Sequence, residues 1–288
     1  MNARAEAYEK LVGEFEVTVL EPSPPAVTEF PFADDPVVPV EVPEGRRVVC
    51  PVPHRADLTW DELCRQRPEL ADWCAERWLG AWRRLEPLPD GFAETGQALH
   101  RVAAEVVSPA RLPENEIALR YTRCGFGTPF FDDGGVDCQV RVQHGELVRQ
   151  RGDREQRETL DGVDVPAAHA LGEFYGFGCS ILEELRAEND DEDPSLTQLW
   201  PEHFDIAIEL GLESEGRRAN CGASPGDEHH DEPYIYVGPW DPEKAKGELW
   251  NATGFPGAEL SYSELLAADD QRRTALEFMR ERLRALKG

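Results

Sequence analysis

The feature that most constrains the fold is a run of alternating apolar and polar residues over 136–142, followed by the turn pair His144-Gly145. The chain then returns through Leu147 and Val148. A period of two directs one face of a strand toward a core, and a short glycine-containing turn joins two such strands into a hairpin. The sequence therefore predicts a β-hairpin, and with it an antiparallel sheet.

Further periodic segments lie on both sides of this hairpin. Alternation predicts strands near 117–121, over 204–210 and over 234–237, and apolar residues at helical spacing predict helices over 94–107, 167–186 and 274–286. Strands that pair locally and are followed by helices indicate helices on one face of each sheet. The expected fold class is α+β, with antiparallel sheets covered by helices.

The two halves of this region resemble each other. Each has a strand, a predicted turn that begins with Cys-Gly (124–129 and 221–226), an acidic patch, a strand and a helix. Either a strand-turn-strand-helix unit is duplicated, or two ordinary segments coincide. Residues 188–193 hold five acids and precede a proline, which predicts a solvated linker. The predicted division is 1–58, 59–190 and 195–288.

The N-terminal part of the chain differs in composition. Nine prolines between 21 and 53 exclude a helix or a central strand and predict a Pro-rich arm, either extended along the surface or acting as a linker. A helix is predicted over 68–85, because apolar residues repeat there at helical spacing. Its tryptophans at 73, 78 and 82 are expected to belong either to the core or to a ligand cleft.

Net charge narrows the possible partners. The 288 residues include 57 Asp and Glu against 30 Lys and Arg, a formal charge of -27 that repels nucleic-acid phosphates and anionic membrane surfaces. No apolar run reaches the ~20 residues of a membrane span, and the first residues do not resemble a signal peptide. We expect a cytoplasmic protein whose partner is a small molecule or a neutral or basic protein, with no nucleic acid and no membrane.

Several motifs resemble those of a bacterial family of unknown function. They are the Trp-x-x-x-Phe-Asp type segment 199–207, Pro225-Gly226-Asp227, the Glu-Pro-Tyr-x-Tyr type segment 232–236, and the upstream segments 117–122 and 125–129. The resemblance covers about residues 94–288. It implies a bacterial protein with aromatic motifs in its C-terminal half, and it supplies no activity, cofactor or catalytic residue. The pair His229-His230 is not part of the family pattern.

Aromatic residues form the first candidate site. Trp200, Tyr234, Tyr236 and Trp240 lie near an acidic segment, and aromatic walls with a few polar groups are typical of small-molecule sites. On a strand, Tyr234 and Tyr236 share one face while their neighbours Ile235 and Val237 enter the core. The alternative is a half-buried strand whose tyrosine hydroxyls reach water.

The segment 227–232 forms the second candidate site, a metal centre. An extended backbone would send Asp227, His229 and Asp231 to one face and Glu228, His230 and Glu232 to the other. One imidazole and two carboxylates suit iron, manganese or zinc, and His203 and Asp205 on a nearby strand would complete the shell. The spacing matches no established ligand motif, and the alternative is a solvated acidic loop.

Two cysteines are weaker candidates. Cys124 and Cys221 are each expected on a tight turn, where a nucleophile would have backbone amides nearby to stabilise an oxyanion. The alternative for each thiol is a small buried hydrophobe. The glycine-rich segments lack the dinucleotide and Walker patterns, and the recognised serine-hydrolase, zinc-protease and kinase signatures are absent from the sequence.

Two functions therefore follow from the sequence. The first is a binding protein whose aromatic and acidic C-terminal site takes a small ligand or a basic partner. The second is a metal-dependent hydrolase or related enzyme, in which one divalent transition metal is held by residues of the 227–231 loop with His203 and Asp205. The binding protein is favoured, because it requires no unusual ligand spacing.

Overall fold

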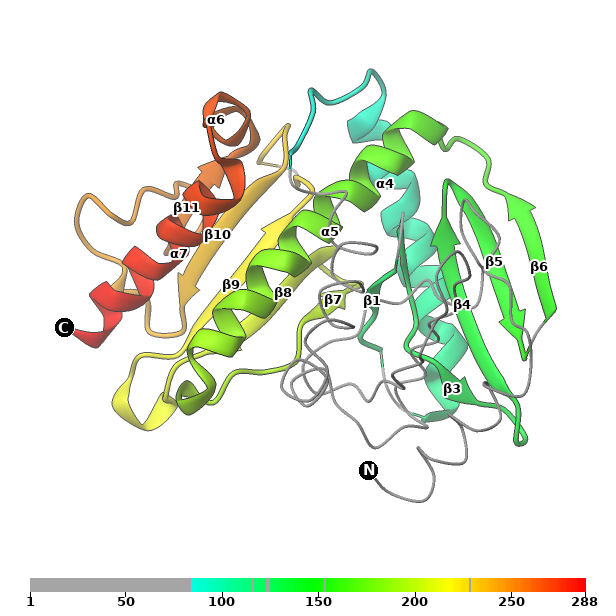
Figure 1. Ribbon diagram of the computed structural model, residues 1–288, viewed down its shortest axis with the longest axis horizontal. Helices are drawn as coiled ribbons and strands as arrows, with labels where there is room; N and C mark the ends of the chain where they lie inside the picture. Colours follow the sequence, from blue (N-terminus) through cyan, green and yellow to red (C-terminus); the bar gives the residue numbers. More distant parts are fainter. Residues whose placement is uncertain (1–83, 115–116, 123–124, 153, 228) are drawn as a thin grey trace, which may run out of the picture.

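A computed structural model describes residues 84–288 except 115–116, 123–124, 153 and 228, and it contains two antiparallel sheets with helices (Figure 1). The predicted α+β class is confirmed. The Pro-rich arm and the tryptophan-bearing helix predicted over 68–85 lie outside the described residues, apart from the last two positions of that helix.

Each sheet is a meander in which, apart from the short strand β3, strands that follow one another in sequence are neighbours in space. The first sheet has the order β1-β2-β4-β5-β6, with β3 paired to β4, and the second has the order β11-β10-β9-β8-β7. The first contains β1 (Arg120–Thr122), β2 (Gly125–Gly127), β3 (Phe131–Asp132), β4 (Asp137–Gln143), β5 (Glu146–Arg151) and β6 (Arg154–Thr159). The second contains β7 (Gln198–Trp200), β8 (Asp205–Leu210), β9 (Ala219–Ser224), β10 (Tyr234–Pro239) and β11 (Ala258–Ser261).

Helices follow each meander, so the two halves share one plan. The α-helices are α4 (Phe92–Val102), α5 (Val165–Glu188), α6 (Tyr262–Ala267) and α7 (Gln271–Lys287). A π-helix (Ala103–Val107) extends α4, and 3-10 turns cover Ser108–Glu114, Asp190–Glu192, Glu213–Glu215 and Pro242–Lys244. Helix α5 comes after β6, and α6 and α7 come after β11. Each half thus has an antiparallel sheet followed by a helix, and duplication of one unit stays a prediction.

The described residues 125–127 and 221–224 of the two Cys-Gly segments belong to strands, which corrects the prediction of turns there. Gly125 lies in β2, where a Cβ atom would come within 1.9 Å of the Val142 carbonyl oxygen on the neighbouring strand. Gly222 lies in β9, where a Cβ atom would come within 2.5 Å of the Tyr236 ring. These glycines permit close approach of neighbouring groups across a sheet, a use that sequence alone does not distinguish from a turn.

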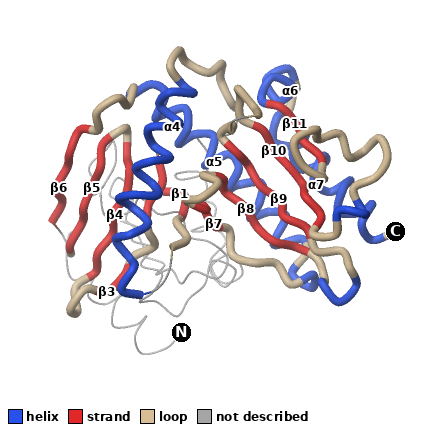
Figure 2. The backbone as a smooth tube through the Cα atoms, turned by 180° about the vertical axis from the view of Figure 1, so that it is seen from behind, coloured by secondary structure: helices blue, strands red, loops and turns tan. Residues whose placement is uncertain are grey.

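The sheets meet at their first strands. Leu119, next to β1, and Leu199 of β7 form an antiparallel bridge in which each N–H donates to the other residue's carbonyl oxygen at 2.8 Å. Figures 1 and 2 both show β1 and β7 side by side at the centre of the molecule. The two meanders are therefore joined edge to edge.

Helix α5 lies across this junction and forms the centre of the core. The Asp164 side chain accepts a hydrogen bond from the Ala167 N–H at 3.0 Å and caps its first turn. Phe174, Phe177 and Ile181 are fully buried, and the buried apolar side chains of both halves form one continuous cluster. The division at 190–195 stays a prediction. The predicted solvated linker is wrong for Glu192, which is 7% exposed and ion-paired with Arg217 and Lys287.

The second sheet has one apolar and one polar face. Ile206, Ile208 and Leu210 of β8 are buried on the face that α5 and α7 cover, as are Ile235 and Val237 of β10. The intervening residues point to the other face, which lies toward the viewer in Figure 2. This alternation confirms the predicted orientation of the β10 side chains.

The first sheet also carries a polar face, and its polar groups bind one another. Arg141 is fully buried and donates to the side chains of Gln150 at 2.9 Å, Gln139 at 3.3 Å and Gln143 at 3.3 Å. It also forms an ion pair with Glu155 of β6. The guanidinium thus has both a charge partner and neutral acceptors, which is what a buried cation requires.

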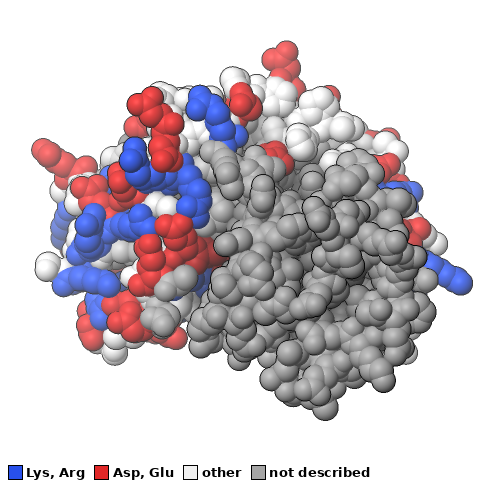
Figure 3. All heavy atoms as spheres, viewed as in Figure 1, with Lys and Arg blue, Asp and Glu red and all other residues white. Residues whose placement is uncertain are grey.

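The outer surfaces of α5 and α7 carry charges of both signs. Arg280 pairs with Glu184 and Glu188, and Arg272 pairs with Glu184. Figure 3 shows Arg, Lys, Asp and Glu side chains intermixed over this part of the molecule. Among the described residues, no helix has the length and apolar character needed to cross a membrane.

Candidate functional site

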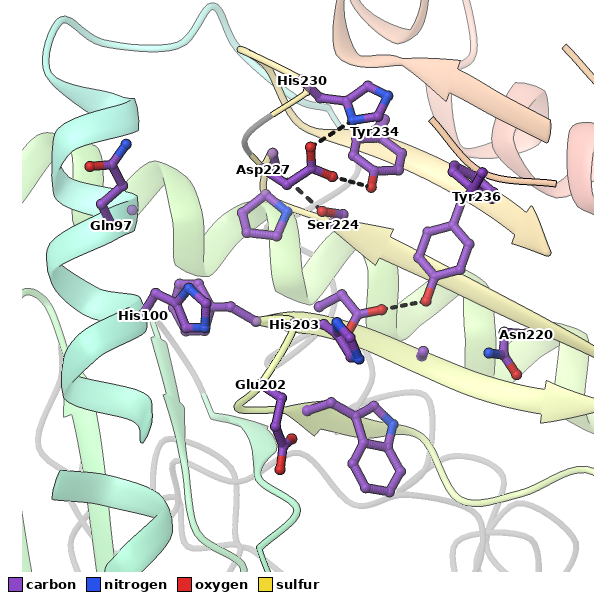
Figure 4. Close-up of a pocket in the computed structure, with 18 of the residues that line it drawn as sticks. Gln97, His100, Glu202, His203, Asn220, Ser224, Asp227, His230, Tyr234 and Tyr236 are labelled. Carbon is purple, nitrogen blue, oxygen red and sulfur yellow. Dashed lines mark hydrogen bonds and ion pairs between the residues drawn. The ribbon is translucent and has the colours of Figure 1, made fainter. Parts of the chain in front are cut away.

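A cavity of about 940 Å³ lies between α4 and the polar face of the second sheet (Figure 4). Strand residues form its floor, because Asp205, Ala207 and Glu209 of β8 lie on the same face as Asn220 and Ser224 of β9. Its other lining residues are Ala93, Gly96, Gln97, His100, Ile117, Trp200, Glu202, His203, Phe204, Ile208, Pro225, Gly226, Asp227, His230, Asp231, Tyr234, Tyr236 and Phe255.

A strained turn between β7 and β8 forms one wall. Phe204 has a φ of 56°, a left-handed conformation that is costly for an aromatic residue, and its N–H donates to the Trp200 carbonyl oxygen at 2.6 Å. His100 of α4 holds this turn in place: its ring stacks on Phe204 with centroids 5.1 Å apart, and its Nε2 is 2.8 Å from the Pro201 carbonyl oxygen. The turn presents Glu202 and His203 to the cavity.

Asp205 is the buried carboxylate of the site. It is 7% exposed, and its Oδ2 accepts a hydrogen bond from the Tyr236 hydroxyl, drawn as a dashed line in Figure 4. Its Oδ1 is buried without a hydrogen-bond partner in the described part of the chain. Burial raises the pKa of Asp205 above its ordinary value, and the Tyr236 hydrogen bond opposes this effect only in part.

Tyr236 is positioned by the strand beneath it. Gly222 is its neighbour on β9, and the absence of a side chain there lets the tyrosine ring lie against the sheet. Burial, followed by the charge of Asp205, raises the pKa of Tyr236 well above its ordinary value, so its hydroxyl keeps the proton that it donates. A Gly222 side chain would displace the ring and break its hydrogen bond to Asp205.

The second carboxylate of the cavity, Asp227, lies in a folded loop, which corrects the extended backbone predicted for 227–232. Gly226 has a φ of 105°, and Asp227 and His230 form a backbone bridge that turns the chain back on itself. Asp227 Oδ1 accepts from the His229 N–H at 2.7 Å and lies 2.9 Å from His230 Nδ1, and Oδ2 accepts from the Tyr234 hydroxyl at 2.7 Å.

His230 links this loop to β11. Its Nε2 lies 3.0 Å from an oxygen of Glu259, so the ring is held between two carboxylates. Burial lowers the pKa of His230, but the hydrogen bonds to Asp227 and Glu259 outweigh burial and raise it above its ordinary value. Burial similarly opposes ionisation of Asp227, but its hydrogen bonds from Tyr234, His229 and His230 lower its pKa overall.

The structure brings together seven of the nine residues predicted from sequence. These are Trp200, His203, Asp205, Asp227, His230, Tyr234 and Tyr236. Trp240 does not line the cavity: it is 47% exposed, its Nε1 donates to Asn220 Oδ1 at 2.9 Å, and Arg218 lies 5.3 Å from its ring centroid. His229 is exposed at the loop surface and does not line the cavity.

Other residues of the site were missed by sequence reasoning. Gln97 and His100 come from α4, far away in sequence, and no local pattern connects them with β8. Asn220 and Ser224 carried a usable signal, because they alternate with the buried residues Cys221 and Ala223. Treating that segment as a turn concealed this alternation.

The geometry gives the predicted metal centre no further support. The described residues contain no group of three or more His, Cys, Asp or Glu side chains placed to hold a metal ion. Asp227 and His230 instead bind each other, and His203 and Asp205 lie on the other side of the cavity in the turn before β8 and at its start. The metal centre stays a prediction, and about one transition-metal ion per chain in protein purified without chelator would establish it.

The predicted nucleophile Cys221 is a buried residue of β9. It is fully buried on the core face of the sheet, and burial raises the pKa of its thiol to about 12. A thiol with this pKa is protonated at neutral pH and is a poor nucleophile. Cys124 lies outside the described residues.

Comparison with known proteins provides no relative for this chain: no protein-family model, curated protein or solved structure matches it. The resemblance to a bacterial family of unknown function therefore stays a prediction.

Proposed function

We propose that the protein binds a small organic ligand in the cavity between α4 and the second sheet. The observation that carries this proposal is the composition of the cavity. Aromatic side chains, among them Trp200, Tyr236 and Phe255, line it together with carboxylates that converge from separate elements. Binding sites for small molecules are concave, largely preformed and lined by aromatic groups with a few fixed polar groups.

The strained turn before β8 supports the same proposal. The left-handed conformation of Phe204 is maintained by hydrogen bonds and by stacking on His100. Backbone strain of this kind is concentrated at sites where a precise geometry is needed. Here it fixes the positions of Trp200 and Asp205 on the two sides of one turn.

Gly96 offers a direct way to fill the cavity. It lies in α4 and lines the cavity, and a Cβ atom there would meet no other atom within 4 Å. A Gly96→Trp substitution therefore places an indole in open space without a clash at its Cβ. Ala104 lies in the π-helix that continues α4, is exposed and does not line the cavity, so Ala104→Trp is the matched control.

The test is a thermal-shift screen of the full chain against a chemically broad set of metabolites that contains amines, carboxylates, sugars and nucleosides. A compound that binds only the folded state raises the melting temperature. We expect such compounds to stabilise the wild type and Ala104→Trp but not Gly96→Trp. The proposal fails if no compound stabilises the wild type, or if Gly96→Trp responds as strongly as the control.

A further inference from the structure

The charge of the cavity lining indicates which class of ligand fits it. Five carboxylates line the cavity, those of Glu202, Asp205, Glu209, Asp227 and Asp231. Among the described residues that line it, none is Lys or Arg. The whole chain adds to this potential with a formal charge of -27. Three histidines also line the cavity, and His230, whose pKa is raised, is held between Asp227 and Glu259. Because carboxylates outnumber the groups that can carry positive charge, the lining favours cations and disfavours anions.

Two of these carboxylates, Asp227 and Asp205, differ in whether both of their oxygens have hydrogen-bond partners. Asp227 is saturated, because Tyr234, the His229 N–H and His230 already bind its two oxygens. Asp205 accepts a side-chain hydrogen bond from Tyr236 on Oδ2, and its Oδ1 is buried without a hydrogen-bond partner among the described residues. An unsatisfied buried carboxylate oxygen costs free energy that a donor of positive charge would recover.

The aromatic groups complete the cation site. Trp200 is the residue opposite Asp205 in the β7–β8 pairing, and Tyr236 donates to Asp205 from the other side. Aromatic faces attract organic cations through the negative potential of the ring. A carboxylate flanked by two aromatic side chains supplies both a charge-assisted hydrogen bond and favourable contact for the carbon atoms of the ligand.

On the basis of the binding function proposed above, we infer that the ligand is a small organic cation with N–H donors, a protonated amine or guanidinium, and that the Asp205 carboxylate receives it. The amine adds a donor of positive charge to the hydrogen bond that Tyr236 already supplies to this carboxylate. The remaining carboxylates of the lining attract the cation without direct contact. Glu202 and Asp231 are exposed and contribute in this way.

The experiment uses four probes that share one carbon skeleton. They are 2-phenylethylammonium, its trimethylammonium analogue, 2-phenylethanol and phenylacetate, each titrated into the full chain by calorimetry. We expect 2-phenylethylammonium to bind about tenfold or more tightly than the alcohol and than the trimethyl analogue, which lacks an N–H donor. We expect no binding of phenylacetate.

Two variants locate the binding site. Asp205→Asn removes the buried charge, and Asp231→Asn removes an exposed charge from the same cavity with the same change in net charge. We expect Asp205→Asn to weaken binding of 2-phenylethylammonium about tenfold or more and Asp231→Asn to weaken it less than about twofold. Equal losses in the two variants would overturn the role of Asp205 in favour of a diffuse field.

A measurement on the wild type keeps the inference testable if Asp205→Asn does not fold. Backbone amide shifts recorded by NMR during titration with 2-phenylethylammonium should change most at Asp205 and Tyr236. Changes centred elsewhere would overturn the inference.

The thermal-shift screen described under the proposed function distinguishes a failure of this inference from a failure of the binding function itself. Stabilisation of the wild type by sugars or carboxylates but not by amines would reject the cation and keep the binding function. No stabilisation by any compound would reject both.

Discussion

Arg141 in the first sheet and Asp205 in the second are both charged side chains buried on the polar face of a sheet. They differ in how fully neighbouring groups satisfy their hydrogen-bonding capacity. Arg141 has an ion pair with Glu155 and three neutral acceptors. Asp205 has a side-chain donor, Tyr236, on Oδ2, and its Oδ1 is buried without a hydrogen-bond partner in the described part of the chain. A saturated charge holds neighbouring strands together, whereas an unsaturated charge beside a cavity is available to a ligand.

We expect the largest effect from a substitution that breaks the hydrogen-bond network around Arg141. Arg141→Leu leaves Arg157 as the ion-pair partner of Glu155 but removes the buried cation that donates to Gln139, Gln143 and Gln150, so we expect a loss of about 3 kcal/mol in the free energy of unfolding. Urea denaturation of the wild type and the variant measures this change. Arg149 is exposed on β5 and pairs with Glu158, so Arg149→Leu is the control and should cost less than about 1 kcal/mol. Equal losses would show that burial of Arg141 is unimportant.

The next effect compares the two tyrosines of β10. Tyr236→Phe removes the side-chain donor to the Oδ2 of Asp205, whose Oδ1 is already buried without a hydrogen-bond partner among the described residues, so we expect a loss of about 2 kcal/mol. Tyr234→Phe leaves Asp227 with its bonds to His229 and His230, so its loss should be about 1 kcal/mol. Chemical denaturation at neutral pH measures both. A larger loss for Tyr234→Phe would contradict the view that Asp205 is the less satisfied carboxylate.

The pH dependence of stability should distinguish the same two carboxylates. The pKa of Asp205 is raised, so the folded state binds its proton more tightly, and the contribution of Asp205 to stability falls as pH rises from about 4 through its folded pKa. The pKa of Asp227 is lowered, so its contribution is present above about pH 4 and is lost as pH falls through its folded pKa.

Unfolding free energies recorded from pH 3 to 9 for the wild type, Asp205→Asn and Asp227→Asn test this difference. Asp205→Asn should gain stability relative to the wild type as pH rises, and Asp227→Asn should lose it. His230 makes a separate contribution to the free energy of unfolding, because its pKa is raised. This contribution is complete below about pH 6.5 and is lost as pH rises through the folded pKa of His230. His230→Gln should remove that loss.

The smallest effect concerns the wall of the cavity. Gly96 lies inside α4, where glycine is unfavourable, and a methyl group at this position meets no neighbour. Gly96→Ala should therefore raise the free energy of unfolding by about 0.5–1 kcal/mol while leaving the cavity open. Thermal denaturation measures the gain. A loss of stability would indicate that the backbone there needs the freedom of glycine.

Much of the fold follows from local sequence patterns. The hairpin around His144-Gly145, the helix ending near Arg186 and the alternation of Tyr234 and Tyr236 with Ile235 all appear as predicted. Burial of one face of a strand or helix imposes a regular spacing of apolar residues, and this spacing can be read from the segment alone. Strand β9 was missed because its glycine and cysteine resemble a turn, and its close approach to Tyr236 depends on a strand more than ten residues away.

The site is less predictable than the fold for the same reason. Asp205 on β8 and Tyr236 on β10 were both candidates, but β9 lies between these strands, and nothing local indicated that this hydroxyl would bind this carboxylate. The left-handed conformation of Phe204 and its stacking on His100 depend on tertiary contacts. The partners of Asp227 and His230 likewise depend on a loop that folds back at Gly226.

The bridge between Leu119 and Leu199 has a consequence for the order of assembly on the ribosome. The strands of the first meander pair with near neighbours in sequence, and such local contacts form quickly. The partner of Leu119 is synthesised 80 residues later. The first meander can therefore form while its β1 edge still lacks a neighbour, and an exposed strand edge is a template for pairing with other chains. Emergence of β7 closes that edge within the same polypeptide.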